Sequence, residues 1–293
     1  MNTDRISSGN TNWSAVFQRY FELNTRYNSG RNNNEKGRAR LNTTVLIAAR
    51  FGLVSPTIVA QLYRMSKRQA LEHLNKLVKR KLLILVETHR SIDGRIYICD
   101  YTGAQFAEEM TGLPIPFRRF NPPERGVNQN TIMHDLMNVH IMLRMLHEPL
   151  RADPEYYNYS GLMTEREFKR QMHLADTRIV DGLILESRED GDYIIAIEIE
   201  NSFKTKAQRS AILLRYLAAL KANIYDKVFL ISQSHDILND IKRLHEQLLS
   251  ELTEVRSKKT KHPLMSADDA GLLKHAIVYR TKYCDELREI FYE

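Results

Sequence analysis

The chain has 293 residues, of which 43% are hydrophobic, and a net charge of +7. This hydrophobic fraction excludes a wholly disordered protein, and the length is enough for about two domains. No apolar run is long enough to span a membrane, and the first residues lack the apolar core of a signal peptide, so we expect a cytoplasmic protein. Two cysteines are too few for a disulfide framework or a four-ligand zinc site.

The positive charge is confined to the N-terminal third of the chain. Residues 1–100 contain 17 basic and 7 acidic residues, whereas residues 101–293 contain 26 basic and 29 acidic residues. A basic segment on a nearly neutral body is typical of a protein that binds a polyanion, most often nucleic acid. The alternative is that these charges only keep the surface soluble.

The first 38 residues are predicted to form a short helix and a linker. Residues 28–38 are polar and rich in Asn and Gly, which predicts a flexible linker. The preceding apolar residues recur at a spacing that predicts an amphipathic helix docked on another part of the protein; they are Trp13, Phe17, Tyr20, Phe21 and Leu23.

Residues 39–116 predict three helices followed by a β-hairpin. Apolar residues recur at helical spacing in 43–51, and Ser55 and Ser66 stand where the N-caps of two further helices are expected. Two short apolar strands around a Gly-containing turn come next. This order is that of a winged helix-turn-helix domain, which a second linker at 117–130 would connect to the rest of the chain.

The predicted third helix would lie in the major groove of DNA, with its first turn nearest the bases. That turn carries Lys67, Arg68 and Gln69, which can donate hydrogen bonds to base edges or phosphates. Arg90 and Arg95, on the predicted hairpin, would reach backbone phosphates. The alternative is a winged helix used for protein pairing, with these side chains merely solvated.

Residues 131–293 predict a mixed sheet covered by helices, an α/β or α+β arrangement. Strands and helices alternate after an initial strand hairpin. In chain order, the expected elements are a helix at 132–146, a short helix capped by Thr164, strands at 178–185 and 193–200, a helix at 205–222, a strand at 227–232, a helix at 236–255 and a strand at 275–280.

Two acidic residues are expected to face each other across this hairpin. If Ser187 pairs with Asp192, the register places Asp181 directly opposite Glu198. Apolar residues flank both acids, and burying two bare carboxylates is costly unless they share a proton, pair with a base or bind a divalent metal ion. Carboxylates at a sheet edge suit Mg²⁺ or Mn²⁺. The alternative is that Asp181 belongs to a turn and Glu198 lies on a solvated strand face.

Other charged residues follow this pair closely. Glu200 lies on the same strand face as the second acid, and Lys204 and Lys206 come at or near the start of the next helix. A metal ion that activates water and a lysine that stabilises the developing negative charge would suit cleavage of a phosphodiester bond. His134 and Asp135 could orient a group in such a site, or could be bonded only locally.

Asp181-Gly182, Glu198-Ile199-Glu200 and Lys204 resemble the signature of the PD-(D/E)xK nucleases in a divergent form. The core of that family is a helix, a strand hairpin that carries the acids, a second helix and another strand. The predicted elements between residues 165 and 232 follow this order. The resemblance therefore implies a restriction-endonuclease-like domain in which Asp181 and Glu198 hold a divalent metal ion.

The sequence departs from the family motif at two positions. Val180 stands where the motif has proline, and Glu200 stands where the motif has lysine. Some members of the family place the lysine in the following helix, so the resemblance implies that Lys204 or Lys206 takes this role. Glu165 lies where many members have an additional acid.

The winged helix, the segment His134-Asp135-Leu136 and the nuclease-like half together resemble the replication-relaxation family, in particular the MobC-type relaxases of mobilisable plasmids. The resemblance covers about residues 40–280. It implies site-specific nicking of supercoiled plasmid DNA at an origin of transfer, to begin conjugative mobilisation. It also implies two partners, an accessory mobilisation protein and a coupling protein.

Relaxases of other classes use a tyrosine to attack the phosphate, and Tyr20 and Tyr27 are candidates. Tyr20 shares its apolar stripe with Phe17 and Phe21, which favours a core position instead. A water activated by a metal ion would need no tyrosine. Two alternative functions remain open, a DNA-binding transcription or replication regulator with an inactive nuclease-like domain, and an interaction adaptor of a transfer apparatus.

Overall fold

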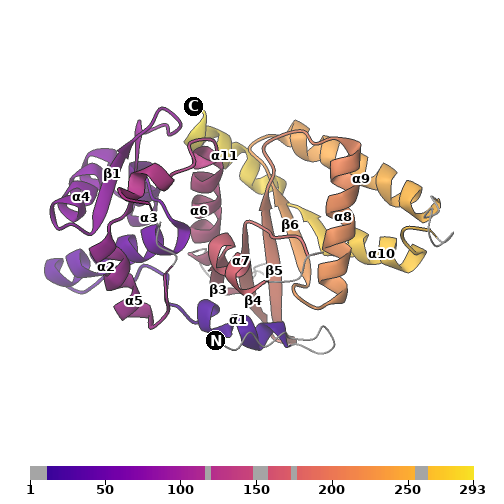
Figure 1. Cartoon of the computed structure of the whole chain (residues 1–293), viewed down its shortest axis with the longest axis horizontal. Helices are drawn as coiled ribbons and strands as arrows, with labels where there is room; N and C mark the ends of the chain where they lie inside the picture. The colour runs from indigo at the N-terminus through magenta and orange to yellow at the C-terminus, as the bar shows by residue number, and fades with distance from the viewer. Residues whose placement is uncertain (1–11, 116–119, 148–157, 173–176, 255–262) are drawn as a thin grey trace.

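The computed structural model describes residues 12–115, 120–147, 158–172, 177–254 and 263–293. Figure 1 shows a smaller N-terminal part, made of helices and a two-stranded hairpin, beside a larger part built on a central sheet. The mixed α and β architecture predicted from the sequence is confirmed. Among the described residues, no helix combines the length and the apolar composition that crossing a membrane requires.

The N-terminal part contains the predicted order of three helices and an antiparallel hairpin. The side chains of Asn32, Ser55 and Ser66 cap the three helices by accepting hydrogen bonds from backbone N–H groups of the first turn. A further helix, which was not predicted, follows the hairpin. The elements are α2 (Asn33–Phe51), α3 (Pro56–Tyr63), α4 (Lys67–Lys79), β1 (Leu83–Glu87), β2 (Arg95–Cys99) and α5 (Tyr101–Thr111).

Helix α2 is longer than predicted, so the flexible linker expected at residues 28–38 is wrong from Asn33 onward. The Asn32 side chain accepts a hydrogen bond from the Glu35 N–H at 2.9 Å, and the Glu35 carboxylate accepts one from the Arg31 N–H at 2.7 Å. These bonds satisfy backbone groups that the start of a helix leaves unpaired. The prediction rested on Asn and Gly content and overlooked this cap.

The central sheet has the strand order β3-β4-β5-β6-β7. Strands β3, β4 and β5 are antiparallel neighbours, and β6 and β7 run parallel to β5. Ser187 pairs with Asp192 and Gly182 with Ile197, which confirms the predicted hairpin register. The strands are β3 (Asn158–Thr164), β4 (Gly182–Arg188), β5 (Gly191–Ile199), β6 (Lys227–Ile231) and β7 (Ile277–Tyr279).

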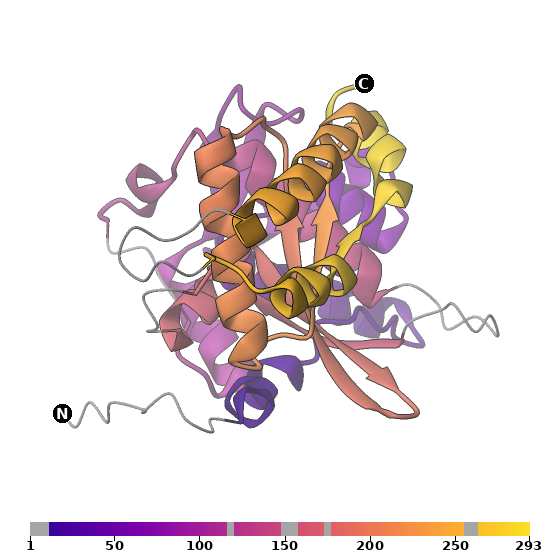
Figure 2. The same ribbon diagram turned by 90° about the vertical axis from the view of Figure 1, so that its right-hand side faces the viewer.

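Helices cover both faces of this sheet (Figures 1 and 2). Helix α6 (Ile132–Leu146) shares a core with Ile195 and Ile197 of β5, whereas Ile194 and Ala196 belong to a second core with α8. The alternation follows from the pleat, which points successive side chains to opposite faces. The remaining elements are α7 (Glu165–Gln171), α8 (Lys206–Lys221), α9 (His235–Glu254), α10 (Ala267–Ala276), α11 (Cys284–Phe291) and two 3₁₀ turns at Pro123–Gly126 and Thr281–Tyr283.

Helix α1 (Trp13–Phe21) packs against the sheet part, as the apolar pattern predicted. The Phe17 ring is fully buried and meets the ring of Phe168 at 5.7 Å, edge to face. Gly161 of β3 approaches α1 so closely that an added Cβ would lie 2.3 Å from the Phe21 carbonyl oxygen. A glycine is therefore needed where this strand passes the helix.

The N-terminal part and the sheet part share one hydrophobic core cluster, to which residues of α2, α3, α6 and β5 all belong. Within this junction, Arg50 of α2 donates hydrogen bonds to the Glu167 carboxylate of α7 at 2.8 and 2.9 Å. Neither residue is more than 3% exposed. The two parts are therefore held together by a shared hydrophobic core and a buried ion pair, as well as by the chain that connects them.

Candidate active site

A small cavity of about 250 Å³ lies where β5 ends and the chain turns toward α8. The end of β5 and the start of α6 also meet here. Most of its lining is polar, and the side chains come from three separate stretches of the chain. They are His134, Arg178, Asp181, Glu198, Ile199, Glu200, Asn201, Ser202 and Lys204.

Glu198 is a deeply buried acid at the cavity, with 1% of its surface exposed. Arg178 donates to its Oε1 from both Nε, at 3.0 Å, and Nη2. The other carboxylate oxygen, Oε2, is buried and has no hydrogen-bond partner. Burial and the charge of Asp181 raise the pKa of Glu198 well above its ordinary value, although Arg178 opposes this.

Asp181 is the residue just before β4, one step beyond the Gly182–Ile197 pair, so it follows the predicted register toward Glu198. Its N–H donates to the Ile197 carbonyl at 3.0 Å. Its Oδ2 accepts a hydrogen bond from the Ile199 N–H at 2.6 Å. The backbone of β5 therefore fixes both the position and the direction of this carboxylate.

His134 brings a cation to Asp181 from the first turn of α6. Its Nε2 lies 3.3 Å from Oδ2 of Asp181 and 3.2 Å from the Ile199 carbonyl oxygen, while its Nδ1 lies 3.6 Å from the Asp135 carboxylate. Burial lowers the pKa of His134, but the hydrogen bonds to Asp135 and Asp181 outweigh this effect and raise it to about 11. The two neighbouring carboxylates therefore favour the protonated, positively charged form of His134.

Glu200 is fully buried between two cations. Arg209 of α8 donates to its Oε1 at 2.7 Å, and the Lys204 ammonium donates to its Oε2. Both carboxylate oxygens are therefore engaged, and Glu200 holds Lys204 at the cavity. The second lysine considered, Lys206, bonds Glu251 at 2.6 Å and does not line the cavity.

Glu165 lies behind Asp181, at the start of α7. Its N–H donates to the Asp181 carbonyl at 3.1 Å, and the Asn138 amide donates to the same oxygen at 2.8 Å. Burial and the negative charges of Asp181 and Asp135 raise the pKa of Glu165. Glu165 and Asp135 line a neighbouring cavity of about 420 Å³, so they adjoin the acid pair without sharing its cavity.

Tyr20 does not line the cavity that contains Glu198. Its ring is buried in α1 with 6% exposed, and its hydroxyl accepts a hydrogen bond from Gln171 at 2.9 Å. Tyr27 packs its ring against Tyr63, with 4.6 Å between ring centroids. Neither tyrosine is placed beside the acidic pair.

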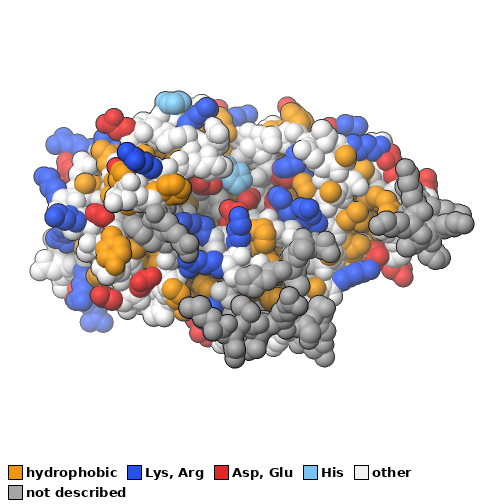
Figure 3. Space-filling model, in the orientation of Figure 1, with side chains coloured by type: hydrophobic (Ala, Val, Ile, Leu, Met, Phe, Trp, Pro, Cys, Tyr) orange, Lys and Arg blue, Asp and Glu red, His pale blue; other side chains and the backbone are white. Residues whose placement is uncertain are grey.

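The residues predicted to contact DNA lie on the N-terminal part, whose surface carries many Lys and Arg side chains at the left of Figure 3. Lys67 is exposed and lies 3.2 Å from Asp93, and Arg68 is 89% exposed with its Nε 3.2 Å from Glu72. The Gln69 side chain caps α4 by accepting from the Ser66 N–H. On the hairpin, Arg90 is exposed, and Arg95 lies opposite Glu87 in the register of the two strands.

Two carboxylates at this cavity, those of Asp181 and Glu198, were predicted to bind a divalent cation. Among the described residues, no group of three or more His, Cys, Asp or Glu side chains is arranged to hold a metal ion. Two carboxylates, Asp181 and Glu198, match the number through which Mg²⁺ is commonly bound together with substrate phosphates. The buried, unpartnered Oε2 of Glu198 is the observation that favours a cation at this position.

Two side chains at this site were not identified from the sequence. Arg178, the partner of Glu198, comes three residues before Asp181 in a segment that was predicted to be strand. Asn138, one turn after His134 on α6, holds the backbone of Asp181. Its position one helical turn after His134, in a helix that is mostly apolar, was the only signal for Asn138.

Comparison of the chain with protein-family models, with curated proteins and with solved structures gives no match.

Proposed function

We propose that this chain is a metal-dependent DNA nuclease of the nicking type, with a winged helix that binds DNA and a PD-(D/E)xK-like domain that cleaves it. The observation that carries the proposal is the Asp181–Glu198 pair at the end of β5. One oxygen of Glu198 is buried without a partner, and Lys204 lies at the same cavity. An unpaired buried carboxylate oxygen is costly, which favours a site that takes a cation.

Asp181 and Glu198 are the residues that would hold Mg²⁺ or Mn²⁺. When bound, such an ion supplies an activated water and neutralises charge on a phosphodiester group. The ion would meet a carboxylate that is already directed by the Ile199 N–H. Ligands held in place before binding lose little conformational freedom on binding, which favours a well-defined geometry.

The cations around the pair have separate roles in this proposal. Glu200 holds the Lys204 ammonium at the cavity, where it would stabilise the charge that develops on the phosphate. His134 and the Ile199 N–H orient the Asp181 carboxylate from two sides. Arg178 offsets the charge of Glu198 in the absence of a metal ion.

DNA recognition is assigned to α4 and the hairpin. The order of α2, α3, α4 and the β1–β2 hairpin supports a winged helix, and the first turn of α4 presents Lys67 and Arg68 to solvent. By the resemblance to MobC-type relaxases, the target would be an origin of transfer on plasmid DNA. The same resemblance suggests an accessory mobilisation protein and a coupling protein as partners.

One observation favours the alternative, a DNA-binding regulator without cleavage. Each acid of the cavity already has a cation: Glu198 has Arg178, Glu200 has Arg209 and Lys204, and Asp181 has His134. Such an arrangement is also that of a structural ion-pair network, in which a metal ion would have no place.

The experiment is nicking of supercoiled plasmids, with and without a cognate origin, in Mg²⁺ or Mn²⁺. Asp181→Asn and Glu198→Gln should each abolish nicking and leave DNA binding intact. Glu251→Gln is the matched control, because this exposed glutamate also pairs with a lysine but lies outside the cavity. Tight DNA binding by folded protein that never nicks a cognate plasmid would establish the regulator instead.

A further inference from the structure

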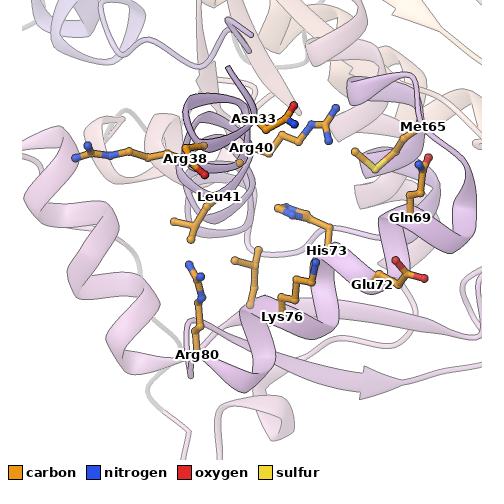
Figure 4. A pocket seen from close by; sticks show the side chains of 13 residues that line it. Asn33, Arg38, Arg40, Leu41, Met65, Gln69, Glu72, His73, Lys76 and Arg80 are labelled. Atoms are coloured by element: carbon orange, nitrogen blue, oxygen red, sulfur yellow. The ribbon is translucent and has the colours of Figure 1, made fainter. Parts of the chain in front are cut away.

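Another, larger cavity of about 590 Å³ lies on the N-terminal part, between the first half of α2 and α4 (Figure 4). It is an open groove, far in the sequence from the acidic pair. Helix α2 contributes Arg38 and Arg40 to its walls, and α4 contributes Lys76, followed by Arg80 just after the helix. Arg38 and Arg40 can line the groove from a helix because α2 already begins at Asn33.

The side chains that line the groove are predominantly positively charged. Glu72 is the only acidic side chain in its lining, and Glu72 already pairs with Arg68 outside the groove. Arg38, Lys76 and Arg80 are exposed, and none of them forms an ion pair with a carboxylate of the described residues. Within the part of the chain that the structure describes, the groove therefore holds three cations without an ion-pair partner.

His73 at the floor of the groove reports the same electrostatic environment. Burial, together with the charges of Arg40 and Lys76, lowers the pKa of His73 to about 4. Its Nε2 is hydrogen-bonded to Thr44 at 2.9 Å. In Figure 4, Lys76 and Arg80 extend from α4 toward α2, and Arg40 projects from α2 on the other side of His73.

Gly37 of α2 also lines the groove, and its backbone carries no side chain that would block access. A Cβ added to Gly37 would meet no atom within 4 Å, so no packing within the protein requires glycine there. Glycine inside a helix costs about 0.5–1 kcal/mol relative to alanine. A bare backbone at this point leaves room for a ligand chain beside the cations.

We propose that this groove binds the sugar–phosphate backbone of DNA, as a phosphate-binding site that continues from the base-reading turn of α4, whose Gln69 lines one end of the groove. The inference rests on the DNA-binding half of the proposed function. It follows from continuity, because α4 supplies Lys67 and Arg68 at its start and two groove cations at its end. A strand whose bases meet the first turn would pass its phosphates along the same helix.

The test measures how DNA affinity depends on salt, for the full chain and without divalent metal, so that cleavage has no part in the readout. Each phosphate contact contributes about 0.9 to the slope of log affinity against log salt. We expect Lys76→Gln/Arg80→Gln to reduce that slope by roughly two and to weaken binding to all duplex sequences alike. Lys79→Gln/Lys81→Gln is the matched control, since it removes the same charge from adjacent exposed positions outside the groove.

A second pair of variants leaves the groove cations in place. Gly37→Glu adds a carboxylate to the wall at a position where an added Cβ meets no atom within 4 Å, and should weaken DNA binding at low salt. Gly37→Gln adds the same bulk without charge and should have a smaller effect. Circular dichroism of both variants checks that α2 remains folded.

The outcomes separate this inference from the proposed function. Equal slope changes in the groove pair and the control pair, or no change in either while the chain binds DNA, overturn the groove alone. A chain that binds no DNA overturns both. If polyglutamate competes as well as DNA and with the same dependence on Lys76 and Arg80, the groove binds an acidic protein segment and the assignment to DNA is wrong.

Discussion

Arg50 of α2 and Glu167 of α7 form a buried ion pair with two parallel hydrogen bonds, at the junction between the N-terminal part and the sheet part. Arg50 also donates to the Leu162 carbonyl at 2.8 Å and to the Tyr20 carbonyl at 3.2 Å. One guanidinium thus joins α1, α2, β3 and α7. Planar arginine is suited to this position because its donors diverge at fixed angles.

Arg50→Met should destabilise the whole chain. Removing one partner of a buried pair leaves the other charge uncompensated, which costs about 3–5 kcal/mol. Urea unfolding would measure this loss as a lower midpoint in a single transition, since both parts share the junction. Arg243→Met, at the exposed pair with Asp240, is the control and should change the free energy of unfolding by less than about 1 kcal/mol. Two separate transitions in the wild-type protein would contradict the shared junction.

Gly161→Ala should loosen α1. The added methyl group would lie 2.3 Å from the Phe21 carbonyl oxygen, so either the strand or the helix must move. Overpacking of this kind typically costs about 1–3 kcal/mol. Limited proteolysis should cut the variant near α1 sooner than the wild type, and Gly271→Ala, where a Cβ meets nothing within 4 Å, should not have this effect. Unchanged cleavage in both would mean that α1 tolerates the displacement.

Much of the fold could be predicted because it depends on residues that are close together in the sequence. The N-caps at Ser55, Ser66 and Thr164 and the alternation of apolar residues in β5 depend only on near neighbours. Strand β3 was missed because its sequence, NYSGLMT, has little alternation and is held by pairing with β4. Its stability lies in contacts that are remote in sequence.

The same distinction applies to the candidate site. The relation of Asp181 to Glu198 follows from hairpin register, so it could be predicted. The approach of His134 to Asp181 could not, because it depends on how α6 packs across the sheet; its other contact, the Ile199 carbonyl, is 65 residues away. Arg178 was missed because an arginine just before a strand has many possible partners.

Arg178→Met should make the stability of the protein depend on divalent metal. Without Arg178, Glu198 lies buried beside Asp181 with no cation on Oε1, so the free energy of unfolding should fall. A metal ion bound by the native state restores stability by mass action. Thermal unfolding with and without Mn²⁺ should show a larger metal-induced increase in Tm for Arg178→Met than for the wild type.

The control for this experiment is Arg178→Met combined with Glu198→Gln. The double variant lacks the buried charge, so it should be more stable than Arg178→Met in the absence of metal and should lose the response to Mn²⁺. The same response in the single and double variants would remove Glu198 from the proposed metal site.

His245 should make the protein sensitive to mild acid. Burial and, to a smaller extent, the charge of Arg209 lower its pKa to about 3, which favours the neutral histidine in the native state. A group with a depressed native pKa contributes stability above its unfolded pKa of about 6.5, and the contribution is lost as the pH falls toward the native value. Between pH 7.5 and pH 5, the loss from His245 alone should be about 2 kcal/mol.

His245→Asn keeps an acceptor near the Tyr279 hydroxyl, which bonds Nδ1 of the histidine at 2.8 Å, and removes the titration. Urea midpoints measured at the two pH values should therefore differ less in the variant than in the wild type. His275→Asn is the control, because this histidine is exposed and should leave the pH dependence as it is. An equal acid-induced loss in His245→Asn would assign the sensitivity to other groups.

Arg68 and Lys67 should differ in what they contribute to DNA binding. The Arg68 side chain is 89% exposed at the first turn of α4, and its ion pair with Glu72 is itself exposed, so its guanidinium is accessible to a base edge. Lys67 forms an ion pair with Asp93 of the hairpin turn, and its ammonium suits a contact with a phosphate.

If Arg68 reads a base, Arg68→Gln should weaken binding to the cognate site by about 1–3 kcal/mol and change binding to unrelated duplexes much less. Lys67→Gln should weaken both alike and lower the salt slope by about 0.9. Titrations against cognate and unrelated duplexes at several salt concentrations measure both quantities, and an equal loss on every sequence for Arg68→Gln would reduce that residue to a phosphate contact.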